Sequence, residues 1–320
     1  MATTSKNSNR SGNPATRSAK AARSGNPAAA STATARDWIA GARPRTLTLA
    51  VAPVALGTAV AYVIEGYDLP VALLCLAVAV FLQIGVNFAN DYSDGVRGTD
   101  TVRVGPQRLT GSGAAPAKTV LTVALVFFGL GALAGLADVV LSGQYWLLAV
   151  GVVALAAAWF YTGGRKPYGY SGFGELVAFL FFGPIAVIGT TYVQIGEVPF
   201  DAVMAGLLVG LFAAAVLLVN NIRDIEQDSL AGKRTLAVRI GDRAARILFG
   251  VLLLTAYGVV AYFSVFYVFA PYVFFSLLLV APVVLIVLTA RTASELVLAL
   301  QLTSIGALLT GVTLAAAIAF

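Results

Sequence analysis

Two amides and two carboxylates stand at the end of a long apolar run that begins near Leu69. They are Asn87, Asn90, Asp91 and Asp94. In a helix these positions are spaced i, i+3, i+4 and i+7, so the four side chains share one face. Carboxylate and amide oxygens are the preferred ligands of Mg²⁺, Ca²⁺ and Mn²⁺. The cluster therefore predicts a divalent-cation site at the mouth of a hydrophobic segment.

A second apolar run ends in a similar pattern. Asn220, Asp224 and Asp228 follow one another at i, i+4 and i+8, so they also line one face of a helix. Asp and Asn at helix ends often act only as caps, which is the alternative interpretation of each cluster taken alone. Because the Asn-x-x-x-Asp spacing occurs in both clusters, we favour two halves of one metal site.

Each acidic segment is followed by a loop that contains glycine and basic residues. Carboxylates repel a phosphorylated ligand, whereas Arg and Lys attract it, so the combination fits Mg²⁺ bridging the carboxylates to a diphosphate. Such a site suits ionisation chemistry, because metal and basic groups stabilise the charge on a departing diphosphate. Topology alone would also place basic loops on the cytoplasmic side. The candidate diphosphate ligands are Arg97, Arg103, Arg108, Arg223, Lys233 and Arg234, and Asp100 could supply a further carboxylate.

The segment from Tyr161 to Tyr170 contains glycine, proline and three tyrosines. Lys166, Tyr168 and Tyr170 are candidates for contact with an aromatic substrate, since phenol rings can stack on it or hydrogen-bond to it. The alternative is an interfacial aromatic anchor. Glu175, near the start of the next apolar segment, either helps to place a substrate or reaches the membrane interface.

The composition identifies an integral membrane protein. Hydrophobic residues make up 59% of the 320 residues and charged residues 11%, about half the charged fraction of a soluble domain. The chain has no histidine, which excludes His-based zinc sites, His-ligated haem and His general-base catalysis. The single cysteine, Cys75, lies in an apolar run and excludes an intramolecular disulfide.

The apolar segments predict an all-α fold with nine transmembrane helices. Each segment is close to the roughly 20 residues that cross a bilayer. A hairpin at Pro271 separates the seventh segment from the eighth. The predicted spans are 46–64, 69–90, 119–137, 144–162, 173–193, 203–221, 247–269, 271–290 and 296–320.

Charged residues separate cleanly between the two sides of such a bundle. With nine spans, every Lys and Arg falls in the N-terminal arm or in the loops after the second, fourth, sixth and eighth spans. The positive-inside rule places these loops and the N-terminus in the cytoplasm and the C-terminus outside. Both acidic clusters then lie at the cytoplasmic face. The loops on the other side carry only Glu65, Asp68, Asp138, Glu197 and Asp201.

Residues 1–36 form a low-complexity tail that is rich in Ser, Ala and Arg and contains no acidic residue. The tail cannot bury enough apolar surface to order itself, so we predict a disordered, basic cytoplasmic arm. An organellar transit peptide is the alternative. Arg43 and Arg45 follow the tail and precede the first span. They could reach a phosphate, but the positive-inside rule explains them better.

These motifs resemble the two aspartate-rich motifs of the UbiA-type intramembrane prenyltransferases. Asn87 to Asp94 resembles the first motif and Asn220 to Asp228 the second, although Asp94 follows Asp91 by three residues where the superfamily commonly has four. Within the superfamily, the segments 90–100, 103–108, 161–170 and 220–236 resemble the branch that prenylates 1,4-dihydroxy-2-naphthoate in menaquinone biosynthesis.

The resemblance implies that residues 37–320 form a nine-helix bundle around a central cavity that is open to lipid. It implies Mg²⁺ as cofactor, with Asp91 and Asp224 as the catalytic pair and Asn87, Asp94, Asn220 and Asp228 completing the metal shell. Diphosphate would leave polyprenyl diphosphate, and the naphthoate ring would take the prenyl group and release carbon dioxide to give demethylmenaquinol. The expected partners are these two substrates and the bilayer of the cell membrane, with no nucleic acid.

Two alternatives remain open at this point. Another member of the superfamily would act on homogentisate, 4-hydroxybenzoate or a glyceryl phosphate. A secondary transporter would also have many spans and intramembrane carboxylates, but its site would lie near the bilayer midplane and not at the helix ends.

Overall fold

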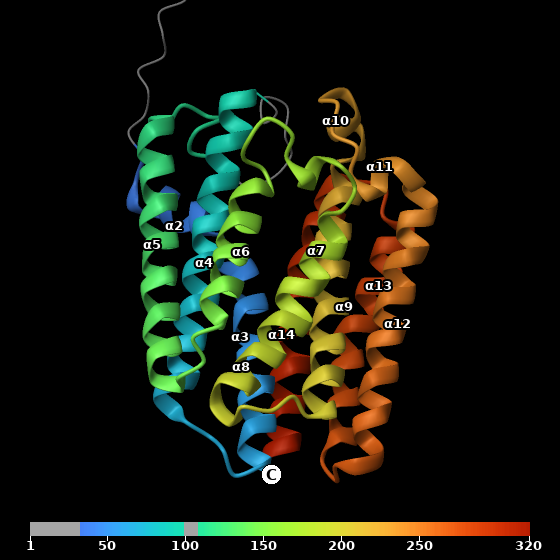
Figure 1. The fold of residues 1–320 in the computed structure, drawn as a ribbon. Coiled ribbons are helices and arrows are strands. Elements are labelled where there is room, and N and C mark those ends of the chain that lie inside the picture. The colour runs from blue at the N-terminus through green and yellow to red at the C-terminus, as the bar shows by residue number, and fades with distance from the viewer. Residues whose placement is uncertain (1–32, 99–107) are drawn as a thin grey trace, which may run out of the picture. The chain divides into compact units, whose positions relative to one another are not determined.

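The computed structural model describes residues 33–98 and 108–320, and this part of the chain is all-helical, without strands (Figure 1). The all-α prediction is confirmed. Most of the predicted tail and two candidate residues, Asp100 and Arg103, lie outside the described residues. The first half contains α2 (Ala35–Ala42), α3 (Pro44–Val63), α4 (Leu69–Arg97), α5 (Ala117–Ser142), α6 (Leu147–Phe160), η1 (Tyr168–Tyr170), α7 (Gly174–Leu180), η2 (Phe181–Ile185) and α8 (Ala186–Ile195). The second half contains α9 (Phe200–Arg223), α10 (Ile225–Leu230), α11 (Leu236–Ile240), α12 (Asp242–Phe266), η3 (Ala270–Ser276), α13 (Leu277–Thr289) and α14 (Ala293–Ala319).

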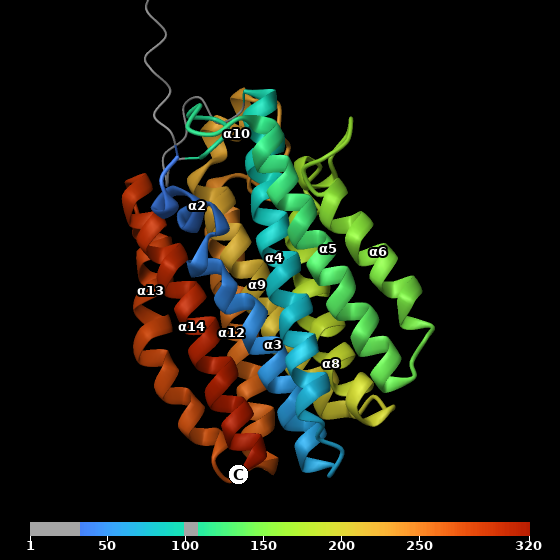
Figure 2. The same cartoon turned by 90° about the vertical axis from the view of Figure 1, so that its left-hand side faces the viewer.

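Eight helical segments of the described chain are long and apolar enough to cross a membrane. They match eight of the nine predicted spans, with α7, η2 and α8 forming one segment and η3 and α13 another. The fourth prediction, 144–162, corresponds to α6, which has only 14 residues. The count of nine membrane-crossing helices is therefore not confirmed, although α6 runs between the same two ends of the bundle as its neighbours (Figures 1 and 2).

The ends of the helices separate the loops as the charge pattern predicts. In Figure 1, α10 and α11 lie at the top of the bundle and the C-terminus lies at the bottom. The loop from α6 to α7 is also at the top, beside the end of α4. The basic residues of these segments therefore gather at one end of the helices, where both acidic motifs are also found.

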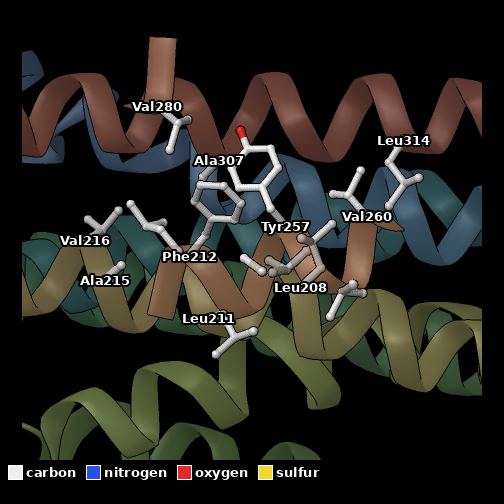
Figure 3. Close-up of a cluster of buried hydrophobic side chains, with 14 of the residues drawn as sticks. Leu208, Leu211, Phe212, Ala215, Val216, Tyr257, Val260, Val280, Ala307 and Leu314 are labelled. Atoms are coloured by element: carbon white, nitrogen blue, oxygen red, sulfur yellow. The ribbon is translucent and has the colours of Figure 1, made fainter. Parts of the chain in front are cut away.

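The core is organised around α9, the most buried of the candidate membrane-crossing helices. Small residues such as Ala205, Ala213 and Ala215 keep neighbouring helices close to it. Phe212 of α9 packs edge-to-face on Tyr257 of α12, with ring centroids 6.3 Å apart (Figure 3). Because α9 carries the second acidic motif at its end, this packing fixes the position of that motif.

Close backbone contact also holds η2 against α9. A Cβ on Gly183 would lie 2.4 Å from the carbonyl oxygen of Gly206, so only glycine allows the two backbones to approach so closely. Pro184, which has no N–H to donate, explains the π-helical turn at this position. The contact anchors the segment that leads back to the loop at Tyr168.

Helix α4, which carries the first motif, has a defined start and stop. The carboxylate of Asp68 accepts a hydrogen bond from the Val71 N–H at 3.1 Å and caps its first turn. Gly98, with φ +72°, ends the helix in the left-handed conformation. The predicted span 69–90 thus extends by two further turns, which project the motif beyond the most apolar part of the helix.

Candidate active site

One cavity of about 1000 Å³ reaches both acidic motifs. It lies between α3, α4, α5, α6, the α7–α8 segment and α9, and its walls are mostly apolar. The sequence prediction that the two motifs face a common space is consistent with this arrangement. The motif residues that line the cavity are Asn87, Asn90, Asp91, Asp94, Asn220, Asp224 and Asp228.

Asp91 is 2% exposed and is bound to the backbone of the loop that precedes α5. Its two carboxylate oxygens accept hydrogen bonds from the N–H groups of Leu109 at 2.9 Å and Thr110 at 2.8 Å. These bonds are charge-assisted and therefore strong. Asp91 thus fixes the return of the chain to the cavity wall, in addition to any role toward a ligand.

Asp94 connects the two motifs. Its carboxylate lies 3.3 Å from the guanidinium of Arg108 and 3.2 Å from the ammonium of Lys233. The same ammonium is 4.0 Å from Asp228 of the second motif. Lys233 therefore lies between carboxylates that are far apart in sequence, and the phenol of Tyr170 also donates a hydrogen bond to Asp94.

The second motif is arranged around Arg223, the last residue of α9. The guanidinium of Arg223 pairs with Asp224 at 2.5 Å and donates a hydrogen bond to the amide oxygen of Asn220 at 2.9 Å. The helix ends at this position, because Asp224 has φ −100° and ψ 10° and links α9 to α10. The break turns α10 and Asp228 back toward Lys233.

The amides of the first motif contact neighbouring segments. The Asn87 amide donates a hydrogen bond to the carbonyl oxygen of Ala42 at 2.9 Å. The hydroxyl of Thr162 donates one to the amide oxygen of Asn90 at 2.6 Å. Asn87 therefore links α4 to the turn between α2 and α3, and Asn90 links it to the loop after α6.

The tyrosines of the 161–170 loop remain protonated phenols at neutral pH. Burial raises the pKa of Tyr168 to about 12, and the Tyr168 hydroxyl donates to the carbonyl oxygen of Ala157 at 2.7 Å. Burial and the nearby Asp94 carboxylate raise the pKa of Tyr170. The Lys233 ammonium lies 4.5 Å from the centroid of the Tyr170 ring, a cation–π contact. Tyr170 thereby joins this loop to the first motif and to Lys233.

The predicted substrate-binding residues divide into three groups. Arg97, Lys166 and Arg234 do not line the cavity: Arg97, for example, donates to the carbonyl oxygens of Thr162 and Gly164 and holds the loop. Asp100 and Arg103 lie outside the described residues. Those that line the cavity are Arg108, Tyr168, Tyr170, Arg223 and Lys233.

Three arginines of the cavity wall were not among the predicted site residues. Arg36, Arg43 and Arg45 all line it, although from the sequence the positive-inside rule explained Arg43 and Arg45 better than contact with a phosphate. Arg43 has φ 54°, a left-handed conformation that is unusual for a residue with a side chain, and it joins α2 to α3. The Arg-Pro-Arg sequence just before the first span was the signal available.

The donors around the cavity fit a hard divalent cation. They are carboxylate and amide oxygens, with no histidine in the chain, and oxygen ligands are those that Mg²⁺ takes. Within residues 33–98 and 108–320, however, no three Asp, Glu, Cys or His side chains converge closely enough to hold a metal ion. Lys233, Arg108 and Arg223 pair with the carboxylates instead. The chemistry of the donor set fits Mg²⁺, whereas the side-chain arrangement is that of an ion-paired network.

The sequence matches the family model described as the UbiA prenyltransferase family over residues 50–305. It is 54% identical over 219 residues to 1,4-dihydroxy-2-naphthoate octaprenyltransferase of Mycobacterium tuberculosis (strain ATCC 25618 / H37Rv), covering 68% of this chain and 75% of that protein. The protein of the same name from Escherichia coli (strain K12) is 38% identical, with 72% of this chain and 76% of that one covered.

Solved structures of this type share the fold. The apo structure of a UbiA homolog from Aeropyrum pernix K1 has a TM-score of 0.61 at 17% sequence identity. The match covers 82% of this chain and 96% of the homolog's chain. A UbiA homolog from Archaeoglobus fulgidus, bound to DMAPP and Mg²⁺, has a TM-score of 0.55 at 16% sequence identity. This match covers 71% of this chain and 77% of the homolog's chain. Because the family model matches most of its length, this multi-pass membrane chain belongs to the UbiA prenyltransferase family.

Proposed function

We propose that this enzyme transfers a polyprenyl group from polyprenyl diphosphate to 1,4-dihydroxy-2-naphthoate in menaquinone biosynthesis. Diphosphate and carbon dioxide are lost and demethylmenaquinol is formed. The observation that carries the proposal is the cavity in which basic side chains pair with the carboxylates of both motifs. The identity to relatives named for this acceptor, 54% and 38% in the two cases above, supports the choice of acceptor.

The first step is cleavage of the bond between the allylic carbon and the diphosphate oxygen, with the electron pair leaving on oxygen. Arg108, Arg223 and Lys233 would hold the departing diphosphate, because all three are largely buried and their charge is poorly screened by water. Their present carboxylate partners keep them at the cavity wall without a ligand. Bidentate Arg contacts suit phosphate oxygens particularly well.

The residues that would hold Mg²⁺ are Asn87, Asp91, Asp94, Asn220, Asp224 and Asp228. When bound, Mg²⁺ supplies positive charge that neutralises the diphosphate as it departs. A UbiA homolog whose fold this chain shares binds Mg²⁺ together with DMAPP, which supports the same cofactor in this chain. Asp91 and Asp224 remain the proposed catalytic pair, one from each motif.

In the second step the ring carbon that bears the carboxylate attacks the allylic carbon. A carbon–carbon bond forms, the bond to the carboxylate breaks, and its electron pair restores the ring as carbon dioxide leaves. The apolar wall protects the allylic cation from water. The neutral phenols of Tyr168 and Tyr170 lie on the same wall and would contact the aromatic acceptor.

We propose that the end of the bundle that carries both motifs faces the cytoplasm, with the enzyme in the cell membrane and the C-terminus outside. The basic residues of the described chain support this orientation, because those in the segments after α4, α6 and α9 lie at that end (Figure 1). A diphosphate from the cytoplasm would then reach the basic side chains directly, while its tail enters the apolar part of the cavity.

The acceptor assay tests the function. Purified enzyme, one polyprenyl diphosphate and Mg²⁺ are combined in separate reactions with dihydroxynaphthoate, 4-hydroxybenzoate, homogentisate or a glyceryl phosphate. We expect product only from the naphthoate, with one equivalent of labelled carbon dioxide released per prenyl group transferred. Product from hydroxybenzoate alone would refute the assignment of the acceptor.

A further inference from the structure

The cavity opens sideways between α5 and α6. Leu136 on α5 and Leu148 and Val152 on α6 line it and are nevertheless 47%, 44% and 68% exposed. A residue that lines a cavity and also has so much exposed surface lies at an opening. The side chains at this one are apolar and belong to the lipid-facing part of the bundle, so an isoprenoid tail can pass here between the bilayer and the cavity.

A second opening lies near the end of the bundle that carries the motifs. Arg36 and Ile39 of α2 and Arg45 at the start of α3 line the cavity and are exposed, Ile39 to 62%. Val297 and Gln301, in the first turns of α14, line it as well. Figure 2 shows α2 near the upper end of the helices. We refer to this opening, lined by these five residues, as the arginine mouth.

The arginines of this mouth keep their charge available. Within residues 33–98 and 108–320, neither Arg36 nor Arg45 forms an ion pair with a carboxylate, whereas the basic residues beside the acidic motifs do. The acidic neighbour of Arg36, Asp37, does not line the cavity. Its carboxylate accepts hydrogen bonds from the N–H and the hydroxyl of Thr34 at 2.8 and 2.7 Å. The arginine mouth therefore presents positive charge to an approaching anion.

The arginine mouth is held next to the first motif. The carbonyl oxygen of Ala42, at the end of α2, accepts the hydrogen bond of the Asn87 amide at 2.9 Å. One residue earlier, α2 packs closely on α4, because a Cβ on Gly41 would lie 2.8 Å from the ring of Phe88. These contacts fix α2 against the helix that carries the motif, so a small anion that enters here arrives beside it.

We propose that the arginine mouth admits the anionic aromatic acceptor and that Arg36 and Arg45 steer its carboxylate. Charge of one sign at the entrance to a cavity raises the rate of encounter with a ligand of the opposite sign. The apolar side chains of Ile39 and Val297 suit the flat ring of the same molecule. A polyprenyl tail would have to leave the bilayer to pass between the arginines, so the donor takes the apolar opening. The inference rests on the proposed function, since it takes dihydroxynaphthoate as the acceptor.

The test measures kcat/KM for dihydroxynaphthoate at several salt concentrations. Arg36→Gln combined with Arg45→Gln should lower it about tenfold at low ionic strength, with kcat and the KM for polyprenyl diphosphate retained. The deficit should shrink as salt screens the charges, and kcat/KM of wild-type enzyme should itself fall with salt. The two Lys substitutions keep the charge and should retain kcat/KM, because steering does not need the guanidinium fork. Arg243→Gln, at an exposed site on α12 outside the cavity, is the matched control.

A second measurement needs no turnover. The association rates of 2-naphthoate, which is anionic, and 2-naphthol, which is neutral, are followed by naphthalene fluorescence in wild-type enzyme and the double Gln variant. We expect the variant to slow 2-naphthoate alone. Equal association rates of 2-naphthoate in the two proteins, an equal loss in Arg243→Gln, or a higher KM for the diphosphate in place of the acceptor overturns the inference. A wild-type enzyme that does not prenylate dihydroxynaphthoate overturns the proposed function instead, and the association rates then still decide whether the arginine mouth steers anions.

Discussion

The ammonium of Lys233 lies 3.2 Å from the carboxylate of Asp94, although 139 positions separate the two residues in the chain. The same ammonium lies 4.0 Å from Asp228, so a single basic side chain connects the two acidic motifs. Both carboxylates are largely buried, where a pair of opposite charges is poorly screened. Lys233 is thus the residue on which the relative position of the motifs most directly depends.

Replacing Lys233 by methionine should lower kcat for prenyl transfer by two orders of magnitude or more. The change removes a charge that would hold the diphosphate and takes a cationic partner from both Asp94 and Asp228. Losing one such electrostatic contact costs about 10²–10³ in rate. Lys118→Met makes the same charge change at an exposed site at the start of α5 and should retain wild-type kcat. Comparable rates for the two variants would contradict the role of Lys233.

Asp91 and Asp224 should respond differently to mutation, although both are proposed catalytic residues. Asp91→Ala should lower activity and also destabilise the fold by about 1.5–3 kcal/mol, because it removes the acceptor of one buried and one partly buried N–H group. Asp224→Ala should abolish activity with a smaller loss of stability, since its carboxylate pairs with the side chain of the adjacent Arg223, a contact that is local in sequence. Thermal unfolding in detergent, measured beside turnover, separates the two effects. Full activity in either variant would refute its catalytic role.

Removal of divalent cations should abolish turnover reversibly. We expect EDTA to reduce prenyl transfer to background and Mg²⁺ to restore it, because the oxygen donors around the cavity suit a hard cation. Asp228→Asn, which keeps one oxygen but loses the charge, should need a higher Mg²⁺ concentration for half-maximal rate. Unchanged turnover after exhaustive chelation would exclude the proposed cofactor.

The sequence predicted the helices more accurately than the contacts of the site. Hydropathy located eight spans, because length and apolar content decide which segments can cross a membrane. The hairpin expected at Pro271 lies just before it, between the end of α12 and the start of η3 at Ala270. Helical spacing grouped Asn87 with Asp91 and Asn220 with Asp224, and all four residues line one cavity. The length of the fourth span was overestimated, because the apolar pattern does not show where the turn before Leu147 ends.

Contacts between distant segments could not be predicted from local spacing. Nothing near Asp91 in the sequence indicates that its carboxylate binds the backbone at Leu109. Likewise, Arg97 follows the first motif directly and was a natural diphosphate ligand, yet it donates to the carbonyl oxygen of Thr162. Such partners are chosen by tertiary packing, which a single sequence does not contain.

Tyr168 should make the stability of the protein depend on alkaline pH. Burial raises its pKa to about 12 from an ordinary value of 10.0. Between pH 10 and pH 12 the unfolded chain loses the phenol proton while the folded protein keeps it. The contribution of the neutral phenol to the free energy of unfolding is therefore complete below pH 10 and is lost as the pH rises to 12. Tyr168→Phe should therefore flatten the fall in unfolding temperature over this range and cost about 1 kcal/mol at neutral pH, from the lost bond to Ala157. An unchanged slope in this variant would contradict the assignment.

Glu175 should act as a positioning residue for the second motif. It is 4% exposed, and its carboxylate accepts a hydrogen bond from the amide of Asn221 at 2.8 Å, which fixes the orientation of a side chain on the cavity wall. Glu175→Leu leaves that buried amide without its acceptor and should lower kcat about tenfold and stability by about 1–3 kcal/mol. Glu175→Gln retains an acceptor oxygen and should restore most of kcat, a rescue that a merely space-filling role would not require. Glu226→Leu, at an exposed position on α10, is the matched control and should leave kcat unchanged. Equal kcat values for the Leu and Gln variants of Glu175 would mean that the hydrogen bond to Asn221 does not position the motif.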